Sequence, residues 1–331
     1  MKTIESTELL KEPPTITGAK TLQVTDSRAL SVCPTVIELT DEHSRQIEAE
    51  AMEGALKFGA TEATLVMARI GLPTAIARID CTIDPLTGDI FAYESDERPA
   101  GMGITDVITR EILGEGVGLK LLGHLEDIFG QVPIVKRHPL EAENDDGMLM
   151  AVEQTSKTAI KAKARPILVR GKPSDLTDMV DIDEATANSV STIRDEGRRQ
   201  YRITTGHATL VTPSCELPSA SFVVKTPQGS QATGVKVCLS AADKKLLGSK
   251  GVVSRANVQK QLDDDKALLI EKFVPGVEAE VNESRGGRMI MRIFCTLTAE
   301  GAKIAGGAFV ARPNHIVHGA SDAVVGAVIV N

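Results

Sequence analysis

Two long segments of the chain have the pattern of helices. The first, DEHSRQIEAEAMEGALKFG (41–59), is rich in helix formers and ends at Gly59. In the second, GITDVITREILGEGVGLKLLGHLEDIFG (103–130), Ile, Val and Leu recur at helical spacing. We therefore expect one helix in the first segment and one or two in the second.

Short apolar runs indicate strands elsewhere. VPIVKRH (132–138), GMLMAV (147–152) and RPILVRGKP (165–173) are typical of buried parallel strands between helices. Residues 1–35 are polar and predict a tail or an edge strand. Strands followed by helices and then by mostly antiparallel strands predict an α+β fold with a small α/β region. The later strands are expected in ASFVVKTP, TGVKVCLS, ALLIEKFV, EAEVNES, RMIMRIFCTLT, KIAGGAFVA and VVGAVIV.

Composition narrows the function classes. The chain has 331 residues, a formal net charge of -8 and only 3% aromatic residues. It therefore lacks the basic footprint and stacking platforms of a nucleic-acid groove, although a local cationic site could still bind small anions. A charged start and the lack of a membrane-length apolar run predict a cytoplasmic protein without a membrane partner. Five dispersed cysteines without a CxxC pair give neither a disulfide framework nor a zinc site.

The stretch ARIDCTIDPLTGDIFAYESDERPAGM (77–102) predicts a hairpin with charges on one face. Alternate residues of a strand share a face, so Arg78 and Asp80 lie together. Glu94 and Asp96 share a face in the same way, and Tyr93 is expected on the opposite one. If PLTGD (85–89) is the turn, residues 84 and 90 pair, and Asp80 comes opposite Glu94.

Two like charges across a hairpin destabilise it unless a cation compensates. Arg78 alone cannot neutralise three carboxylates, whereas a hard divalent cation such as Mg²⁺ could. The other interpretation of the same spacing is a solvated acidic face.

The segment FVVKTPQGSQATGVKV predicts a strand that delivers Lys225, a loop with Gly229 and Gly234, and a second strand from Val235. Such a loop lets backbone N–H groups close around phosphates while the lysine supplies a point charge. An ordinary hairpin with an exposed lysine is the alternative.

The segment ALLIEKFVPGVEAEV predicts a strand that ends in a polar hinge with Glu271 and then a Pro275–Gly276 breaker. Backbone amides of such a hinge can meet an adenine edge, and Glu278 is placed to accept from ribose hydroxyls. The alternative is a strand that leaves its sheet through a turn with surface acids.

Together these three motifs resemble those of the ATP-grasp family of ligases, most directly the D-alanine:D-alanine ligase type. The hairpin precedes the lysine loop, as in the circularly permuted group that includes glutathionylspermidine synthetase. The resemblance implies two α+β lobes that enclose ATP. It divides the chain into an N-terminal segment (1–35), part of the large lobe with the metal hairpin (36–115), an α/β substrate-binding region (116–185), the small lobe (186–250) and the hinge with the rest of the large lobe (251–331).

The resemblance also implies roles for individual residues. Asp80, Glu94 and Asp96 would ligate Mg²⁺, although Asp96 stands where the family usually has Asn. Arg78 would hold the γ-phosphate or the acyl-phosphate transition state, and Arg312 would face the phosphates or the intermediate. The ATP-binding set would be Lys225 at the α/β-phosphates, Gly229 and Ser230 above them, Glu271 at the adenine amino group, Lys272 and Val274 in the hinge, and Glu278 at the ribose.

These roles imply an ATP-dependent carboxylate-amine ligase that forms an acyl phosphate and releases ADP and phosphate. Its partners would be small-molecule carboxylate and amine substrates, with a homodimer left open. Two alternatives stay open, a phosphotransferase on the same scaffold and a non-catalytic nucleotide-binding protein.

Overall fold

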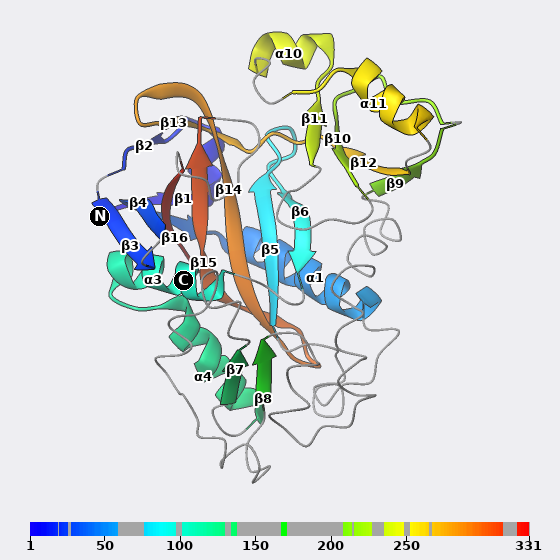
Figure 1. Ribbon diagram of the computed structural model, residues 1–331. Helices are drawn as coiled ribbons and strands as arrows, with labels where there is room; N and C mark the ends of the chain where they lie inside the picture. Colours follow the sequence, from blue (N-terminus) through cyan, green and yellow to red (C-terminus); the bar gives the residue numbers. More distant parts are fainter. Residues whose placement is uncertain are drawn as a thin grey trace.

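The computed structural model describes residues 1–18, 20–25, 28–58, 76–96, 101–129, 134–137, 167–170, 208–213, 215–226, 235–247, 252–264, 267–313 and 323–330. They form a mixed α+β fold with a large curled mixed sheet and a small antiparallel sheet (Figure 1). The predicted α+β class is confirmed at this level.

Ten of the described strands form the large sheet. Its main path runs β1, β4, β16, β15, β14, β13 and β2, while β3 pairs with β4 and β5 joins β14 to β6. β4 is parallel to β1 and β16, and β2 is parallel to β13, whereas the other pairs are antiparallel. The bounds are β1 (Lys2–Glu5), β2 (Thr15–Ile16), β3 (Lys20–Thr25), β4 (Arg28–Leu39), β5 (Ile76–Ile83), β6 (Ile90–Asp96), β13 (Val277–Val281), β14 (Ser284–Leu297), β15 (Ala302–Arg312) and β16 (Val324–Val330).

Helices cover one face of this sheet and part of the other. The helices α1 (Asp41–Phe58) and α4 (Val117–Phe129) share a core with the sheet, because α1 buries Ile47, Ala51 and Ala55 at helical spacing. On the opposite face α3 (Met102–Leu113) packs against β4, β15 and β16. The segment 103–130, where one or two helices were expected, therefore forms two, and the helix expected in 41–59 is confirmed.

The N-terminal residues belong to the large sheet. β1 and β2 lie at the two ends of its main path, which confirms the edge-strand alternative for these two strands but not for residues 28–35, which lie in β4. A 3-10 helix, η1 (Ser6–Leu10), follows β1, and β4 is an internal strand between β1 and β16.

The small sheet is antiparallel and runs β11, β10, β12, β9. Helix α11 (Arg255–Asp263) packs on it through Val258 and Leu262, and α10 (Ala241–Leu247) follows β11 in the chain. The four residues Phe273–Gly276 link β12 to β13 and thus the small sheet to the large one; we call them the hinge segment. The strand bounds are β9 (Ala208–Val211), β10 (Phe222–Lys225), β11 (Lys236–Cys238) and β12 (Leu268–Lys272).

A third, two-stranded sheet pairs β7 (Ile134–Arg137) in parallel with β8 (Ile167–Arg170). This confirms two of the three predicted parallel strands, while GMLMAV lies outside the described residues. None of the helices in the described ranges is long and apolar enough to cross a membrane.

Candidate functional site

The β5–β6 hairpin has the predicted cross-strand pair of acids. Asp80 is opposite Glu94, and Arg78 is opposite Asp96. The predicted pairing of residues 84 and 90 is wrong, because Ile83 is the partner of Ile90. The register shifts by one residue between the turn and Asp80, because β6 contains one extra residue, Tyr93, which forms a bulge.

The bulge also changes where Tyr93 points. We predicted Tyr93 on the face opposite Glu94, but it packs against the apolar cluster under α3 that includes Val310. That cluster lies on the same sheet face as Glu94. The prediction is therefore wrong, since strict alternation fails where a strand carries an unpaired residue.

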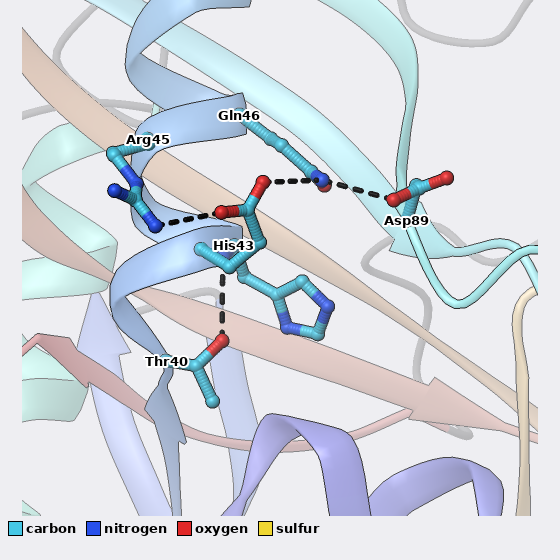
Figure 2. A network of polar contacts seen from close by, with 6 residues as sticks. Thr40, His43, Arg45, Gln46 and Asp89 are labelled. Carbon is cyan, nitrogen blue, oxygen red and sulfur yellow. Dashed lines mark hydrogen bonds and ion pairs between the residues drawn. The ribbon is translucent and has the colours of Figure 1, made fainter.

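Helix α1 holds the turn of the hairpin in place. Gln46 donates from Nε2 to Asp89 Oδ1 at 3.0 Å (Figure 2). Its Oε1 accepts the backbone N–H of Ile90 at 2.7 Å. His43 contacts the carbonyl oxygen of Gly88 through Nε2 at 2.9 Å and Ser6 Oγ through Nδ1 at 2.7 Å. These contacts fix the hairpin against the body of the large sheet.

A buried arginine lies among the acids of the hairpin. Arg78 donates from Nε to Asp80 Oδ1 at 2.7 Å, and its Nη2 lies 3.5 Å from Asp96 Oδ2. Burial lowers the pKa of Arg78, but the carboxylates of Asp80, Asp96 and Glu94 raise it more, so the net shift is upward. Arg78 therefore stays protonated.

Further arginines lie on the same face, on the strands next to the hairpin. Arg292 is the β14 partner of Asp80, and its Nε lies 3.5 Å from Asp80 Oδ2. Arg288 of β14 is opposite Arg312 of β15, and both are buried. Sequence analysis singled out Arg312 but missed Arg288 and Arg292, which the alternation of RMIMR places on one face of a strand.

On the small sheet, Lys225 and Glu271 lie on one face and form an ion pair. Lys225 Nζ is 2.8 Å from Glu271 Oε2, and the Glu271 side chain is only 4% exposed. Lys225 Nζ also donates to the carbonyl oxygen of Tyr93 at 3.3 Å. The predicted phosphate lysine thus touches the predicted metal hairpin, although the two are far apart in sequence.

The hinge segment is held by the hairpin. Tyr93 Oη donates to the carbonyl oxygen of Val274 at 2.9 Å, and the Val277 N–H donates to Thr82 Oγ1 at 3.0 Å. Lys272 pairs with Asp84 at 3.0 Å, so its side chain faces the turn of the hairpin.

Glu278, predicted at the ribose, lies at the start of β13. It pairs with Arg288 at 3.4 Å, and its side chain is 54% exposed. A carboxylate that is held yet accessible can still accept from a ligand. Gly229 and Ser230 lie outside the described residues.

The acids of the hairpin suit Mg²⁺ only in part. Their oxygen donors are the right type, but among the described residues no three His, Cys, Asp or Glu side chains form a group that could hold a metal ion. Mg²⁺ commonly takes one or two carboxylates and completes its shell with phosphate oxygens and water. Asp80 and Glu94 therefore fit such an ion if a phosphate-bearing ligand supplies the remaining oxygens.

Comparison with known proteins adds no family to this description. The chain matches no protein-family model, and no curated protein matches its sequence.

Proposed function

We propose that the chain binds ATP between its large sheet and its four-stranded small sheet and uses it to join a carboxylate to an amine, with release of ADP and phosphate. The observation that supports this most is the Lys225–Glu271 pair at the end of β12. Adenine presents the N6 amino donor and the N7 acceptor on one edge. A carboxylate beside an ammonium group offers the complementary acceptor and donor, so the proposal places Lys225 at the base instead of at the α/β-phosphates.

The charges beyond this pair suit the phosphates. Arg78 is buried and protonated, and it lies on the same face of the large sheet as the Tyr93 side chain. The carbonyl oxygen of Tyr93 accepts a hydrogen bond from Lys225. A bound Mg²⁺ would neutralise phosphate charge, with Asp80 and Glu94 as its protein ligands. The large sheet and the small antiparallel sheet, joined by the hinge segment, support the proposal of an ATP-grasp fold with its motifs in permuted order.

The reaction needs no protein nucleophile. A substrate carboxylate oxygen attacks the γ-phosphorus and ADP leaves, which gives an acyl phosphate. The amine then attacks the carbonyl carbon, phosphate leaves, and the amine loses a proton. Arg78 would stabilise the charge that crowds onto the transferring phosphoryl group, and Lys225 would fix the nucleotide.

One observation favours a second candidate, a nucleotide-binding protein without catalysis. Asp80 lies between Arg78 and Arg292, so its carboxylate already has two cationic neighbours. A carboxylate held in this way is a weaker metal ligand than an uncompensated one.

Thermal unfolding with and without MgATP tests the proposal. We expect MgATP to stabilise the wild type, Lys225→Met to lose this effect, and Lys236→Met, a change on neighbouring β11, to keep it. A wild type that MgATP does not stabilise contradicts ATP binding altogether.

A screen of acid and amine pairs for ADP release then separates the chemistries. ADP and free phosphate that require both an acid and an amine support the ligase. A phosphorylated acceptor indicates a phosphotransferase, and ATP binding without turnover indicates the non-catalytic candidate. For the ligase, Asp80→Asn should abolish turnover.

A further inference from the structure

We infer that Arg288 and Arg312 form an oxyanion subsite, which binds a carboxylate or phosphate group of a ligand on the face of the large sheet. The subsite adds Arg288 to the residues that sequence analysis identified. The identity of its ligand rests on the proposed function, whereas the evidence for the subsite comes from the two arginines themselves.

The two arginines oppose each other on neighbouring strands. Arg288 of β14 and Arg312 of β15 are cross-strand partners and are 7% and 8% exposed. Like charges directly opposite each other destabilise a sheet, and burial increases the cost. An anion bound between them would remove that repulsion.

A half-exposed acid of β13 pairs with Arg288. Glu278 is its cross-strand partner on β13, with 3.4 Å between Glu278 Oε2 and Arg288 Nη1. Across β13, β14 and β15, Glu278, Arg288 and Arg312 therefore stand in one row, and Glu278 is its half-exposed member.

Arg288 also has a hydrogen-bond donor that is not used within the described residues. Its Nε is buried and has no hydrogen-bond partner among the described residues. A buried donor without a partner costs free energy, so such groups mark places where a ligand or water completes the bonding. Guanidinium groups bind carboxylate and phosphate through two parallel hydrogen bonds, and Nε commonly supplies one of them.

The subsite is separate from the cluster around Arg78. Arg288 and Arg292 are four residues apart on β14, which is roughly 13 Å along a strand. Arg292 belongs to the Asp80 row, whereas Arg288 lies in the row of Glu278. This distance leaves room for one ligand oxyanion at Arg288 and a second one at the cluster around Arg78.

The experiment measures binding of succinate, pyrophosphate and adenosine by calorimetry at constant ionic strength. We expect Arg288→Gln and Arg288→Lys to weaken succinate or pyrophosphate binding at least about tenfold. Adenosine, which has no oxyanion, should bind these variants as it binds the wild type. Arg45→Gln, at an exposed arginine of α1, is the control that should change nothing.

Two results would overturn the inference. One is that neither succinate nor pyrophosphate binds the wild type more tightly than chloride does. The other is that a folded Arg288→Lys variant binds both anions with the same affinity as Arg45→Gln. Lysine keeps the positive charge but cannot form the two parallel hydrogen bonds of a guanidinium group. Circular dichroism of each variant establishes that it is folded.

The same measurements separate the ligand sources. Succinate that still binds in saturating ADP assigns the subsite to the acid substrate, and succinate that ADP displaces assigns it to the nucleotide phosphates. If the anions bind but adenosine and MgATP do not, the proposed function fails while the subsite stands.

Discussion

The phenol group of Tyr93 donates a hydrogen bond of 2.9 Å to the carbonyl oxygen of Val274. One residue lies in the bulge of β6 and the other in the hinge segment, so this bond ties the large sheet to the link between the sheets. Burial raises the pKa of Tyr93, which keeps the hydroxyl protonated as a donor.

Tyr93→Phe should lower the free energy of unfolding by about 1 kcal/mol, because the ring stays packed and only the bond to Val274 is lost. If the hinge segment binds adenine, MgATP should also bind about three- to tenfold more weakly. Chemical denaturation and calorimetry measure the two effects. Phe91→Leu, which changes the neighbouring ring 5.5 Å away, should leave MgATP affinity unchanged.

The Lys225–Glu271 pair predicts nucleobase selectivity. GTP should bind about 100-fold or more weakly than ATP, since its O6 would face the carboxylate of Glu271. ATP with carbon in place of N7 should bind about fivefold more weakly, because Lys225 then has no acceptor on the base. Competition binding with these analogues checks both values, and equal affinity for ATP and GTP would remove Glu271 from the base site.

The same pair also predicts a stability pattern. Lys225→Met should destabilise the protein by about 3 kcal/mol, because it leaves the buried carboxylate of Glu271 without its cation. Adding Glu271→Gln should restore much of this loss, whereas ATP binding should stay lost in the double variant. Urea unfolding of the two single variants and the double variant gives the coupling free energy.

His124 predicts a loss of stability in mild acid. Burial lowers its pKa below the ordinary 6.5, and Lys303 and Lys120 lower it further against the opposing effect of Asp127. Between the folded pKa and 6.5 the unfolded chain binds more protons, so stability present above pH 6.5 is lost as the pH falls through the folded pKa. His124→Asn should flatten the melting temperature measured from pH 7.5 to 5, and Lys303→Gln should flatten it in part.

Two glycines near α4 predict opposite effects of the same substitution. A Cβ at Gly116 would lie 1.7 Å from Oδ1 of buried Asp106, which accepts the Gly118 N–H at 2.9 Å. Gly116→Ala should therefore cost about 1–3 kcal/mol. Gly123, inside the helix, has nothing within 4 Å of an added Cβ, so Gly123→Ala should stabilise by about 0.5–1 kcal/mol. Thermal unfolding of the two variants makes the comparison.

Local patterns predicted most of the elements. The helices in 41–59 and 103–130 and the later strands could be located because their apolar spacing and glycine boundaries depend on neighbouring residues alone, whereas α10 and α11 were not predicted. The Asp80–Glu94 pair was predicted from a turn register that is one residue off at Ile90, and the bulge at Tyr93 brings the two acids opposite each other. The order of the large sheet depends on contacts between distant segments, so the internal position of β4 was not predicted.

In the candidate site, too, local motifs could be predicted but contacts between distant segments could not. Lys225 and Glu271 were identified from motifs, but their ion pair depends on the antiparallel pairing of β10 with β12. Arg288 was missed because its importance arises from Arg312 on another strand. Tyr93 was misplaced because nothing in FAYESD distinguishes a bulge from a regular strand.

The extra residue in β6 has a consequence for how this segment can change. It shifts the phase of side chains along the strand, so Ala92 and Ser95 both face the core while Glu94 and Asp96 face the charges. Deleting Tyr93 would make Ala92 and Glu94 consecutive and restore strict alternation, so both would keep their partners and faces while the phenol that contacts Val274 is lost. The bulge therefore lets this strand carry one more side chain on the charged face than a regular strand with the same partners could carry.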